Sequence, residues 1–253
     1  IDKSCKAPVI FVQGNESMAP HFKTTGKNDS RHVETCGFYK PLSFLDSIRK
    51  VEEYQNELLE QGIRENVIRI NLNKLDPDYE PRVVNREDKG KKKEEPDQIK
   101  IKRESETPAT IGSLSSIVKL MTSYEPDILS TILVNIKGQK IPISSIIVDQ
   151  EKAHRLLWEE TESMVTNNYF VYGEVDAVIR REKVIYINLK PLNKILFSIV
   201  LFDKYFKYFS YTDDQLVGKQ ILVWGELNKN TYNDKNTTEM VIKSDKYIEV
   251  LKG

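Results

Sequence analysis

The sequence predicts an α+β protein whose C-terminal part is a small five-stranded β-barrel, preceded by a hairpin and a helix. Two observations support this fold class. Strand-like runs follow one another from residue 165 to residue 253, and a segment that can form a short helix separates the third run from the fourth. The first and fourth runs contain a central glycine, Gly173 and Gly225. A glycine inside a strand is typical of the sharp bend that a small barrel needs where one strand serves both of its sheets.

The barrel strands are predicted from runs rich in β-branched and aromatic residues. These runs are residues 169–180, 184–189, 197–202 and 220–227, with a fifth strand formed by 239–242 together with 247–250. Residues 204–216 are aromatic-rich and form the predicted helical segment. Three strands, a helix and two further strands is the order of a five-stranded Greek-key barrel.

The rest of the chain divides by composition. At 253 residues the chain has room for two cores. We predict an N-terminal α+β region, a charged linker, a helix-hairpin-helix lead-in and the barrel, which span residues 1–75, 76–110, 111–164 and 165–253.

The N-terminal region contains the clearest helix. Ser43 can cap it, Asp46 provides an acidic residue in its first turn, and Gly62 can end it. Leu45 and Ile48 begin an apolar stripe at helical spacing. Residues 9–12 and 67–72 are predicted as strands on either side of this helix.

The linker is predicted from its charge and proline content. Residues 86–95 are almost all charged, and four prolines lie between residues 76 and 110. So few apolar groups cannot offset the entropy of ordering the chain, which favours a solvated tether. Residues 91–93 are three lysines, but the acidic residues beside them cancel their charge.

The lead-in is predicted to begin with a helix at residues 114–121. A hairpin of residues 128–136 and 140–148 turns at Gly138. Asp149 then caps a second helix, on which His154 lies beside an apolar face and is interpreted as a packed or surface residue.

Five segments of the barrel region resemble the tRNA-anticodon-type and related OB-fold nucleic-acid-binding domains. They are VYGEV at 171–175, IYINL at 185–189, SIVLF at 198–202, GKQILVWGE at 218–226 and EMVI at 239–242. The resemblance covers about a third of the chain and is more specific for the fold than for the ligand.

If the resemblance holds, it implies a ligand over the second and third barrel strands, with bases on aromatic rings and phosphates on cations. The candidate nucleic-acid-binding residues are Arg180, Arg181, Lys183, Tyr186, Asn188, Lys190, Trp224, Lys229, Tyr232 and Lys243. Tyr186 and Trp224 can equally be residues of the core or the barrel wall.

Charge leaves a second function open. Lys and Arg total 38, as do Asp and Glu, and residues 165–253 hold 13 basic against 11 acidic residues. Because phosphate binding depends on neutralising charge, this balance is weak support for a nucleic-acid partner. The alternative is a protein-interaction or assembly subunit that uses the barrel and the N-terminal helix as docking surfaces.

An enzyme is not the preferred interpretation, and no catalytic residue, cofactor or metal is predicted. Ser17 lies in a Ser-Met-x-Pro segment that resembles the nucleophile site of signal-peptidase-like serine proteases, yet no strand presents the lysine base. Cys5, His21, His32 and Cys36 are zinc-ligand types that lack paired spacing.

The sequence also contains no apolar run near the roughly 18 residues that a membrane helix needs. The protein is therefore expected to be soluble and cytoplasmic, without a membrane partner. Its oligomeric state is not predicted.

Overall fold

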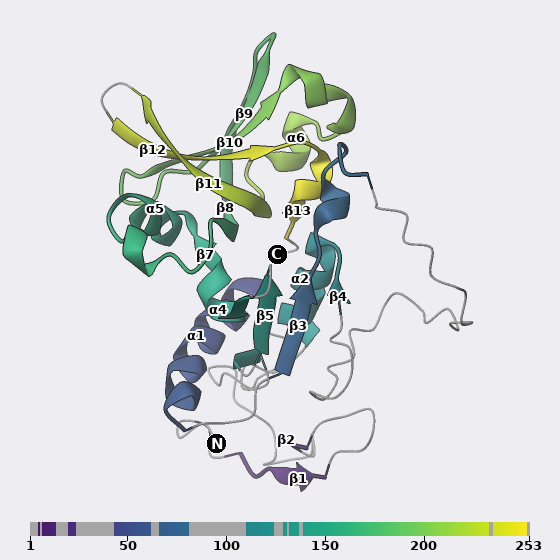
Figure 1. Ribbon diagram of the computed structural model, residues 1–253, viewed down its shortest axis with the longest axis vertical. Helices are drawn as coiled ribbons and strands as arrows, with labels where there is room; N and C mark the ends of the chain where they lie inside the picture. Colours follow the sequence, from purple (N-terminus) through teal and green to yellow (C-terminus); the bar gives the residue numbers. More distant parts are fainter. Residues whose placement is uncertain are drawn as a thin grey trace, which may run out of the picture.

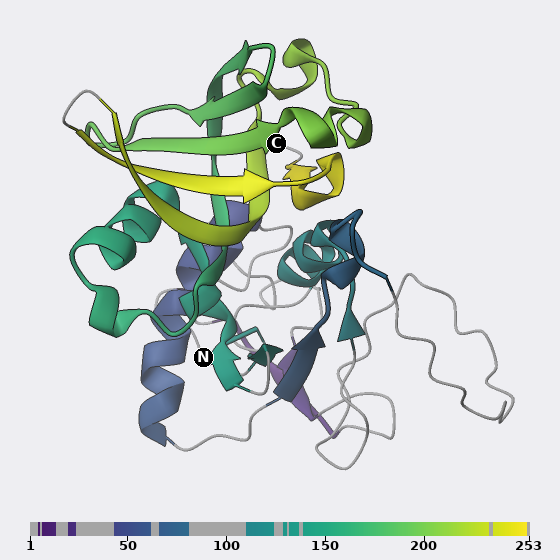
Figure 2. The same ribbon diagram turned by 45° about the horizontal axis from the view of Figure 1, so that its top comes forward.

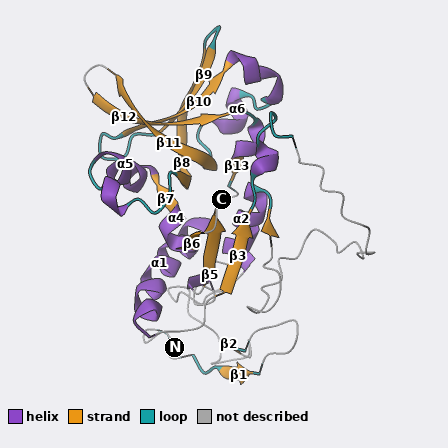
Figure 3. Cartoon of the chain, viewed as in Figure 1, coloured by secondary structure: helices purple, strands orange, loops and turns teal. Residues whose placement is uncertain are grey.

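The computed structural model describes residues 5, 7–13, 20–23, 43–61, 66–80, 110–123, 129–130, 132–136, 139–232 and 235–251. Figure 1 shows a barrel in the upper part of the molecule and a helix–sheet unit below it, and the view in Figure 2 shows the same stacking. Figure 3 marks helices and strands along the same trace. The α+β fold class is therefore confirmed.

The lower unit is built around a four-stranded sheet of order β4-β3-β5-β6. Its strands are β3 (Asn66–Ile70), β4 (Thr110–Ile111), β5 (Ile132–Ile136) and β6 (Gln139–Pro142). β3 runs parallel to β4 and β5, and β5 runs antiparallel to β6. A strand of the N-terminal stretch thus pairs with strands of the lead-in stretch, so these two stretches share one sheet.

Two helices share a buried core with this sheet. They are α1 (Phe44–Gln61) and α2 (Leu114–Ser123). The predicted cap of α1 is confirmed, because the backbone N–H of Asp46 donates to the Ser43 hydroxyl at 3.1 Å. The short 3₁₀ helix η1 (Asn73–Leu75) follows β3, and a separate pair of strands, β1 (Ile10–Val12) and β2 (His21–Lys23), lies nearer the N-terminus.

A chain segment of mixed structure leads from the sheet to the barrel. It comprises α4 (Ile143–Ile146), β7 (Ile147–Asp149), α5 (Gln150–Trp158) and the 3₁₀ helix η2 (Thr161–Ser163). The Asp149 carboxylate caps α5 by accepting the Lys152 backbone N–H at 2.7 Å, as the sequence predicts.

The barrel consists of five main strands. They are β8 (Asn168–Arg180), β9 (Val184–Leu189), β10 (Leu196–Phe202), β11 (Gln220–Tyr232) and β12 (Lys235–Ile242). Between β10 and β11 lie the 3₁₀ helix η3 (Asp203–Tyr208) and α6 (Asp213–Leu216), and after β12 come η4 (Asp245–Tyr247) and β13 (Ile248–Val250).

The pairing of these strands closes the barrel in OB order. β8 pairs with β9 and β9 with β10, both antiparallel, and β10 pairs parallel with β12. β12 pairs antiparallel with β11, which returns to β8. This circuit of five strands is that of the OB fold, so the predicted barrel is confirmed.

Gly173 and Gly225 lie close to the points where their strands change partner. β8 pairs with β11 up to Glu174 and with β9 from Val175 onward. β11 pairs with β8 up to Glu226 and with β12 from Leu227 onward. A Cβ at Gly173 would lie 2.8 Å from Leu189 Cδ1, and one at Gly225 would lie 2.6 Å from Met240 Cγ. Each glycine therefore lets a side chain of the neighbouring strand pack closely against its backbone.

One wall of the barrel is shared between two buried cores. Along β8 and β11, Tyr169, Val171 and Val223 point into the barrel, whereas Phe170 and Trp224 belong to the core of the lower unit. Because successive side chains of a strand point to opposite faces, the β8–β11 wall is covered on both sides. In the described part of the chain, no residue of β9, β10 or β12 belongs to the core of the lower unit.

Three predicted elements differ from the structure. The second hairpin run is not one strand, because α4 interrupts it and β7 pairs with β8 instead. The first hairpin run begins as a strand only at Ile132. The fifth barrel strand is β12 alone, since η4 separates it from β13, which pairs with β11. The local pattern of apolar residues could not show where these strands begin and end or with which strand each one pairs.

Candidate nucleic-acid interface

The outward side of β9 and β10 carries a row of apolar side chains that crosses four strands. Ile179, Tyr186, Val200 and Val241 are successive partners across β8, β9, β10 and β12. Ile179 is 39% exposed and Val241 is 37% exposed, while Tyr186 is half-buried. Val200 lies at the centre of the row and is only 3% exposed. The row therefore forms an apolar strip with a buried centre, and its two ends reach solvent.

Two further rows flank this strip. On one side Val184 pairs with Phe202, whose ring is 43% exposed. On the other side Asn188 pairs with Ser198, and the Ser198 hydroxyl donates to the Asn188 side-chain oxygen at 2.8 Å. We call these three rows the β9–β10 face, and its members are Ile179, Val184, Tyr186, Asn188, Ser198, Val200, Phe202 and Val241.

The predicted cations at the β8–β9 turn fall into two groups. Arg180 is held by the barrel itself, because its Nε donates to Asp213 Oδ1 and its Nη2 to the Tyr211 carbonyl, each at 2.8 Å. Arg181 and Lys183 are exposed, and neither forms an ion pair with any residue that the structure describes. These two side chains are therefore cations near this end of the face that a phosphate can reach without displacing an acid.

Two other predicted lysines have partners of different kinds. Lys190 follows β9, and its Nζ lies 3.2 Å from Glu174 Oε1. Lys229 lies on β11 opposite Thr238, and its Nζ sits 4.9 Å from the centroid of the Trp158 ring. That ring belongs to the α5 side of the barrel, so Lys229 does not extend the β9–β10 face. Tyr232 pairs with Lys235 on β12, and its side chain is not among those that the structure describes.

Trp224 does not belong to the interface, contrary to one of its two predicted roles. Its side chain is 9% exposed and lies in the core beneath the β8–β11 wall. Its ring centroid is 4.3 Å from that of Phe170, its direct partner on β8. A base cannot stack on this indole while the barrel is packed on the lower unit, so of the two interpretations the core residue is correct.

Lys243 lies at the end of β12, and two acids of the lower unit hold its side chain. Its Nζ is 2.7 Å from Asp76 Oδ2 and 3.3 Å from Asp78 Oδ2. Asp78 also accepts the Tyr205 phenol at 2.6 Å. These hydrogen bonds raise the pKa of Lys243 above its usual range, Asp76 contributing most, whereas the Tyr205 hydrogen bond lowers the pKa of Asp78. A phosphate would have to compete with both carboxylates for this lysine.

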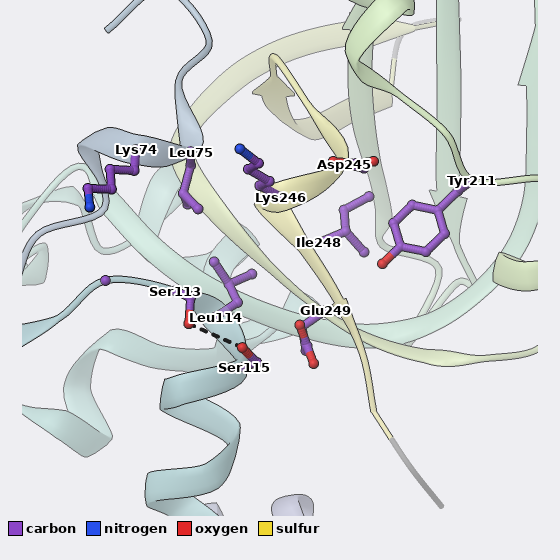
Figure 4. A pocket seen from close by; sticks show the side chains of 11 residues that line it. Lys74, Leu75, Ser113, Leu114, Ser115, Tyr211, Asp245, Lys246, Ile248 and Glu249 are labelled. Atoms are coloured by element: carbon purple, nitrogen blue, oxygen red, sulfur yellow. Dashed lines mark hydrogen bonds between the residues drawn. The ribbon is translucent and has the colours of Figure 1, made fainter. Parts of the chain in front are cut away.

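A pocket of about 340 Å³ lies beside this cluster, between η1, the start of α2 and the η4–β13 segment (Figure 4). Lys74 and Lys246 lie on its rim with Asp245 and Glu249, and Ser113 forms a hydrogen bond to Ser115 at 3.1 Å. Positive and negative groups thus line it together. It adjoins the contact between the lower unit and the barrel rather than the β9–β10 face.

Several residues of this region were not predicted from the sequence, and they include Ile179, Phe202, Val241 and Tyr205. The first three follow the same alternation as Tyr186 in their strands, so strand phase could have found them. Nothing local in the sequence indicates the partnership of Tyr205 with Asp78. Ser17, His32 and Cys36 lie outside the described residues, as do residues 81–109 of the predicted linker 76–110.

In the part of the chain that the structure describes, no helix combines the length and apolar character needed to cross a bilayer. No protein-family model matches the chain, and no curated protein matches it either.

Solved structures with similar folds have low sequence identity and low TM-scores. An asparaginyl-tRNA synthetase from Entamoeba histolytica has 13% identity and a TM-score of 0.23, over 36% of this chain and 22% of its own. A replication protein A heterotrimer bound to single-stranded DNA has 5% identity and a TM-score of 0.24, over 47% of this chain and 70% of its own. The N-terminal domain of PriB from Thermoanaerobacter tencongensis has 15% identity and a TM-score of 0.22, over 34% of this chain and 98% of its own. This chain thus spans about a fifth of the synthetase, and its own strand order is what assigns the barrel to the OB fold.

Proposed function

We propose that the protein is a non-catalytic binding protein that holds single-stranded nucleic acid on the β9–β10 face of its barrel. The observation that carries the proposal is the apolar strip from Ile179 through Tyr186 to Val241, with the Phe202 ring beside it. Bases present apolar faces that stack on exposed aromatic rings, largely without regard to sequence. Tyr186 and Phe202 are the two aromatic side chains available for this contact.

The cations around the face set the expected strength of binding. Arg181 and Lys183 can follow a phosphate backbone from the β8–β9 turn, and Lys190 can do so after leaving Glu174. The number of cations around the face is small, so binding releases few counterions from the nucleic acid. The affinity should therefore fall only gently as the salt concentration rises. A modest, sequence-tolerant affinity follows from this arrangement.

The direct test is fluorescence anisotropy with a labelled oligothymidylate and with the matching oligouridylate, at low and at physiological ionic strength. We expect binding that weakens with salt. Tyr186→Ala should cost about 1–3 kcal/mol of binding free energy if the ring stacks on a base. Tyr208→Ala is the matched control, because Tyr208 is also partly exposed but lies on η3, outside the face. An oligonucleotide that fails to bind the folded protein even at low salt rejects the proposal.

A protein partner is the second candidate. Ile179 and Val241 are aliphatic side chains at the two ends of the strip, and exposed aliphatic residues fit a protein surface better than they fit bases. In that case the oligonucleotides should not bind, and Ile179→Asp should abolish co-purification of a defined partner without unfolding the barrel. Retention of the partner by this variant would contradict the docking function.

A further inference from the structure

The segment that follows η1 brings two carboxylates to one end of the barrel. Asp76 and Asp78 reach Lys243 at 2.7 and 3.3 Å, and Asp78 accepts the Tyr205 phenol. The backbone N–H of Asp78 donates to the Asp76 side chain at 2.9 Å, which orders the two acids relative to each other. We call residues 76–78 the acidic segment.

The anchor of the acidic segment is separate from its charges. The buried Ser244 hydroxyl donates to the Leu75 carbonyl at 2.7 Å, and Leu75 itself is buried. These contacts hold η1 against the barrel by packing and a neutral hydrogen bond. The carboxylates beyond it are more exposed, with 30% of the Asp76 side chain and 55% of the Asp78 side chain accessible to solvent. The acids can therefore exchange partners while η1 stays docked.

The groups that hold the acidic segment border the β9–β10 face. Lys243 comes directly after the end of β12, two residues beyond Val241, and Tyr205 lies on η3, three residues beyond Phe202. Lys204 adds a second cation, with its Nζ 4.6 Å from the centroid of the Tyr205 ring. Lys243, Lys204 and the largely buried Tyr205 thus form a corner beyond the ends of β10 and β12, the two strands that carry Phe202 and Val241.

We propose that the acidic segment is an internal competitor for the backbone phosphates of a single strand, so that its carboxylates occupy the corner formed by Lys243 and Tyr205 when no nucleic acid is bound. The inference rests on the proposed function, because it concerns the same face. A carboxylate and a phosphate diester both accept hydrogen bonds through anionic oxygens, and a lysine ammonium together with a phenol hydroxyl serves either one. A nucleic-acid strand that binds along the face would displace Asp78 first, because Asp78 is more exposed than Asp76 and its ion pair with Lys243 is the longer of the two.

The strength of the competitor is limited by its exposure. Ion pairs that solvent reaches are weak, so the acidic segment should reduce affinity without abolishing it. Removing both charges should therefore tighten oligonucleotide binding about fivefold at low salt, a change that corresponds to ion pairs of this class. The gain should shrink as salt rises, because screening weakens the competitor and the ligand alike.

The test is a mutant cycle on the full chain with oligothymidylate as the probe. Asp76→Asn with Asp78→Asn should bind about fivefold more tightly than the parent protein. Lys243→Met alone should bind within about twofold of the parent, since the lysine is already occupied. The triple variant, which combines Asp76→Asn, Asp78→Asn and Lys243→Met, should not bind more tightly than the parent, because the lysine that the two acids release is absent. Asp78→Asn alone keeps the Asp76 ion pair and the Ser244 hydrogen bond. This single variant replaces the double variant in the cycle if the double variant has a lower melting temperature than the parent.

A matched control separates competition from net charge. Glu159→Gln with Glu162→Gln removes two exposed carboxylates, one at the C-terminal cap of α5 and one on η2. Equal tightening by both pairs of substitutions, or a gain that persists without Lys243, overturns the competitor while the proposed function stands. Oligonucleotide binding that is absent from the parent and from every variant instead rejects the proposed function, and the inference with it.

Discussion

Phe170 and Trp224 pack against each other as cross-strand partners on the outside of the barrel, with ring centroids 4.3 Å apart and the rings tilted by 40°. Both rings lie in the core of the lower unit, together with Ile147 and Leu222. The same two strands send Val171 and Val223 into the barrel. The β8–β11 wall thus joins the two halves of the protein, whereas the β9–β10 face lies outside this contact.

Trp224 should therefore matter for stability rather than for direct ligand contact. Trp224→Ala removes a large ring from a packed core, and we expect a loss of about 3–5 kcal/mol in the free energy of unfolding. Urea denaturation followed by circular dichroism measures it. Tyr186→Ala is the comparison, because its half-buried ring should cost less than Trp224 in stability and more in binding. The reverse ranking would mean that the two rings have been assigned to the wrong sides of the barrel.

The order of the barrel strands could be predicted because it depends on short segments of the sequence. β-branched runs, turn residues and the two glycines each act over a few residues, and they agree with one another. The interruption by α4 and the separate pairing of β13 could not be predicted in this way. Both depend on which distant strand offers a free edge, namely β8 for β7 and β11 for β13.

The candidate site was predictable only in part, for a similar reason. Arg181, Lys183 and Tyr186 follow from strand position, whereas the burial of Trp224 depends on the lower unit that covers it. One local signal was available, since residues 221–224 are apolar without alternation, as in strands buried on both faces. Lys243 and Asp76 are 167 residues apart, and no local pattern links them.

Gly173 should tolerate no side chain. An added Cβ would lie 2.8 Å from Leu189 Cδ1 and 2.9 Å from Gln150 Oε1, and Gln150 is buried with its amide donating to the Lys190 carbonyl at 2.6 Å. Gly173→Ala should therefore destabilise the protein by about 1–3 kcal/mol through overpacking. Gly112→Ala is the control, because the nearest atom to its Cβ would be 3.9 Å away. Equal denaturation midpoints for the two variants would contradict the close approach.

His154 should make the stability depend on pH. Its ring is buried and forms a hydrogen bond to Thr238 Oγ1 at 2.8 Å. Burial lowers its pKa below the usual value of 6.5, against a smaller opposing effect of Glu159. Between the folded pKa and 6.5 the unfolded chain binds more protons than the folded protein, so stability is full above pH 6.5 and falls as the pH drops through this window.

The measurement for His154 is the free energy of unfolding from about pH 5 to about pH 8 in the parent and in His154→Gln. The parent should lose stability toward the acidic end with a slope of less than one proton from this residue. The glutamine variant should be less stable than the parent at the alkaline end and should show a shallower decline. Parallel curves for the two proteins would show that another group carries the dependence.

Arg181 and Lys183 should contribute charge and no sequence preference. Both are exposed in the β8–β9 turn beside the apolar strip, and a cation that contacts phosphates weakens the binding of every sequence alike when it is removed. Arg181→Gln with Lys183→Gln should therefore reduce the affinity for oligothymidylate and oligouridylate by the same factor. The slope of log affinity against log salt should flatten by about 0.7 for each phosphate that is no longer neutralised, or about 1.4 for both.

The control for this pair is Arg180→Gln, which removes a neighbouring charge that Asp213 already holds at 2.8 Å. That variant should leave the salt slope nearly unchanged, because an occupied guanidinium releases no counterion from a bound strand. A slope that is insensitive to Arg181 and Lys183, together with binding that persists, would place the phosphates elsewhere on the barrel. The corner of Lys243 and Tyr205 would then be the next position to test, since the Asp76 and Asp78 variants change that site alone.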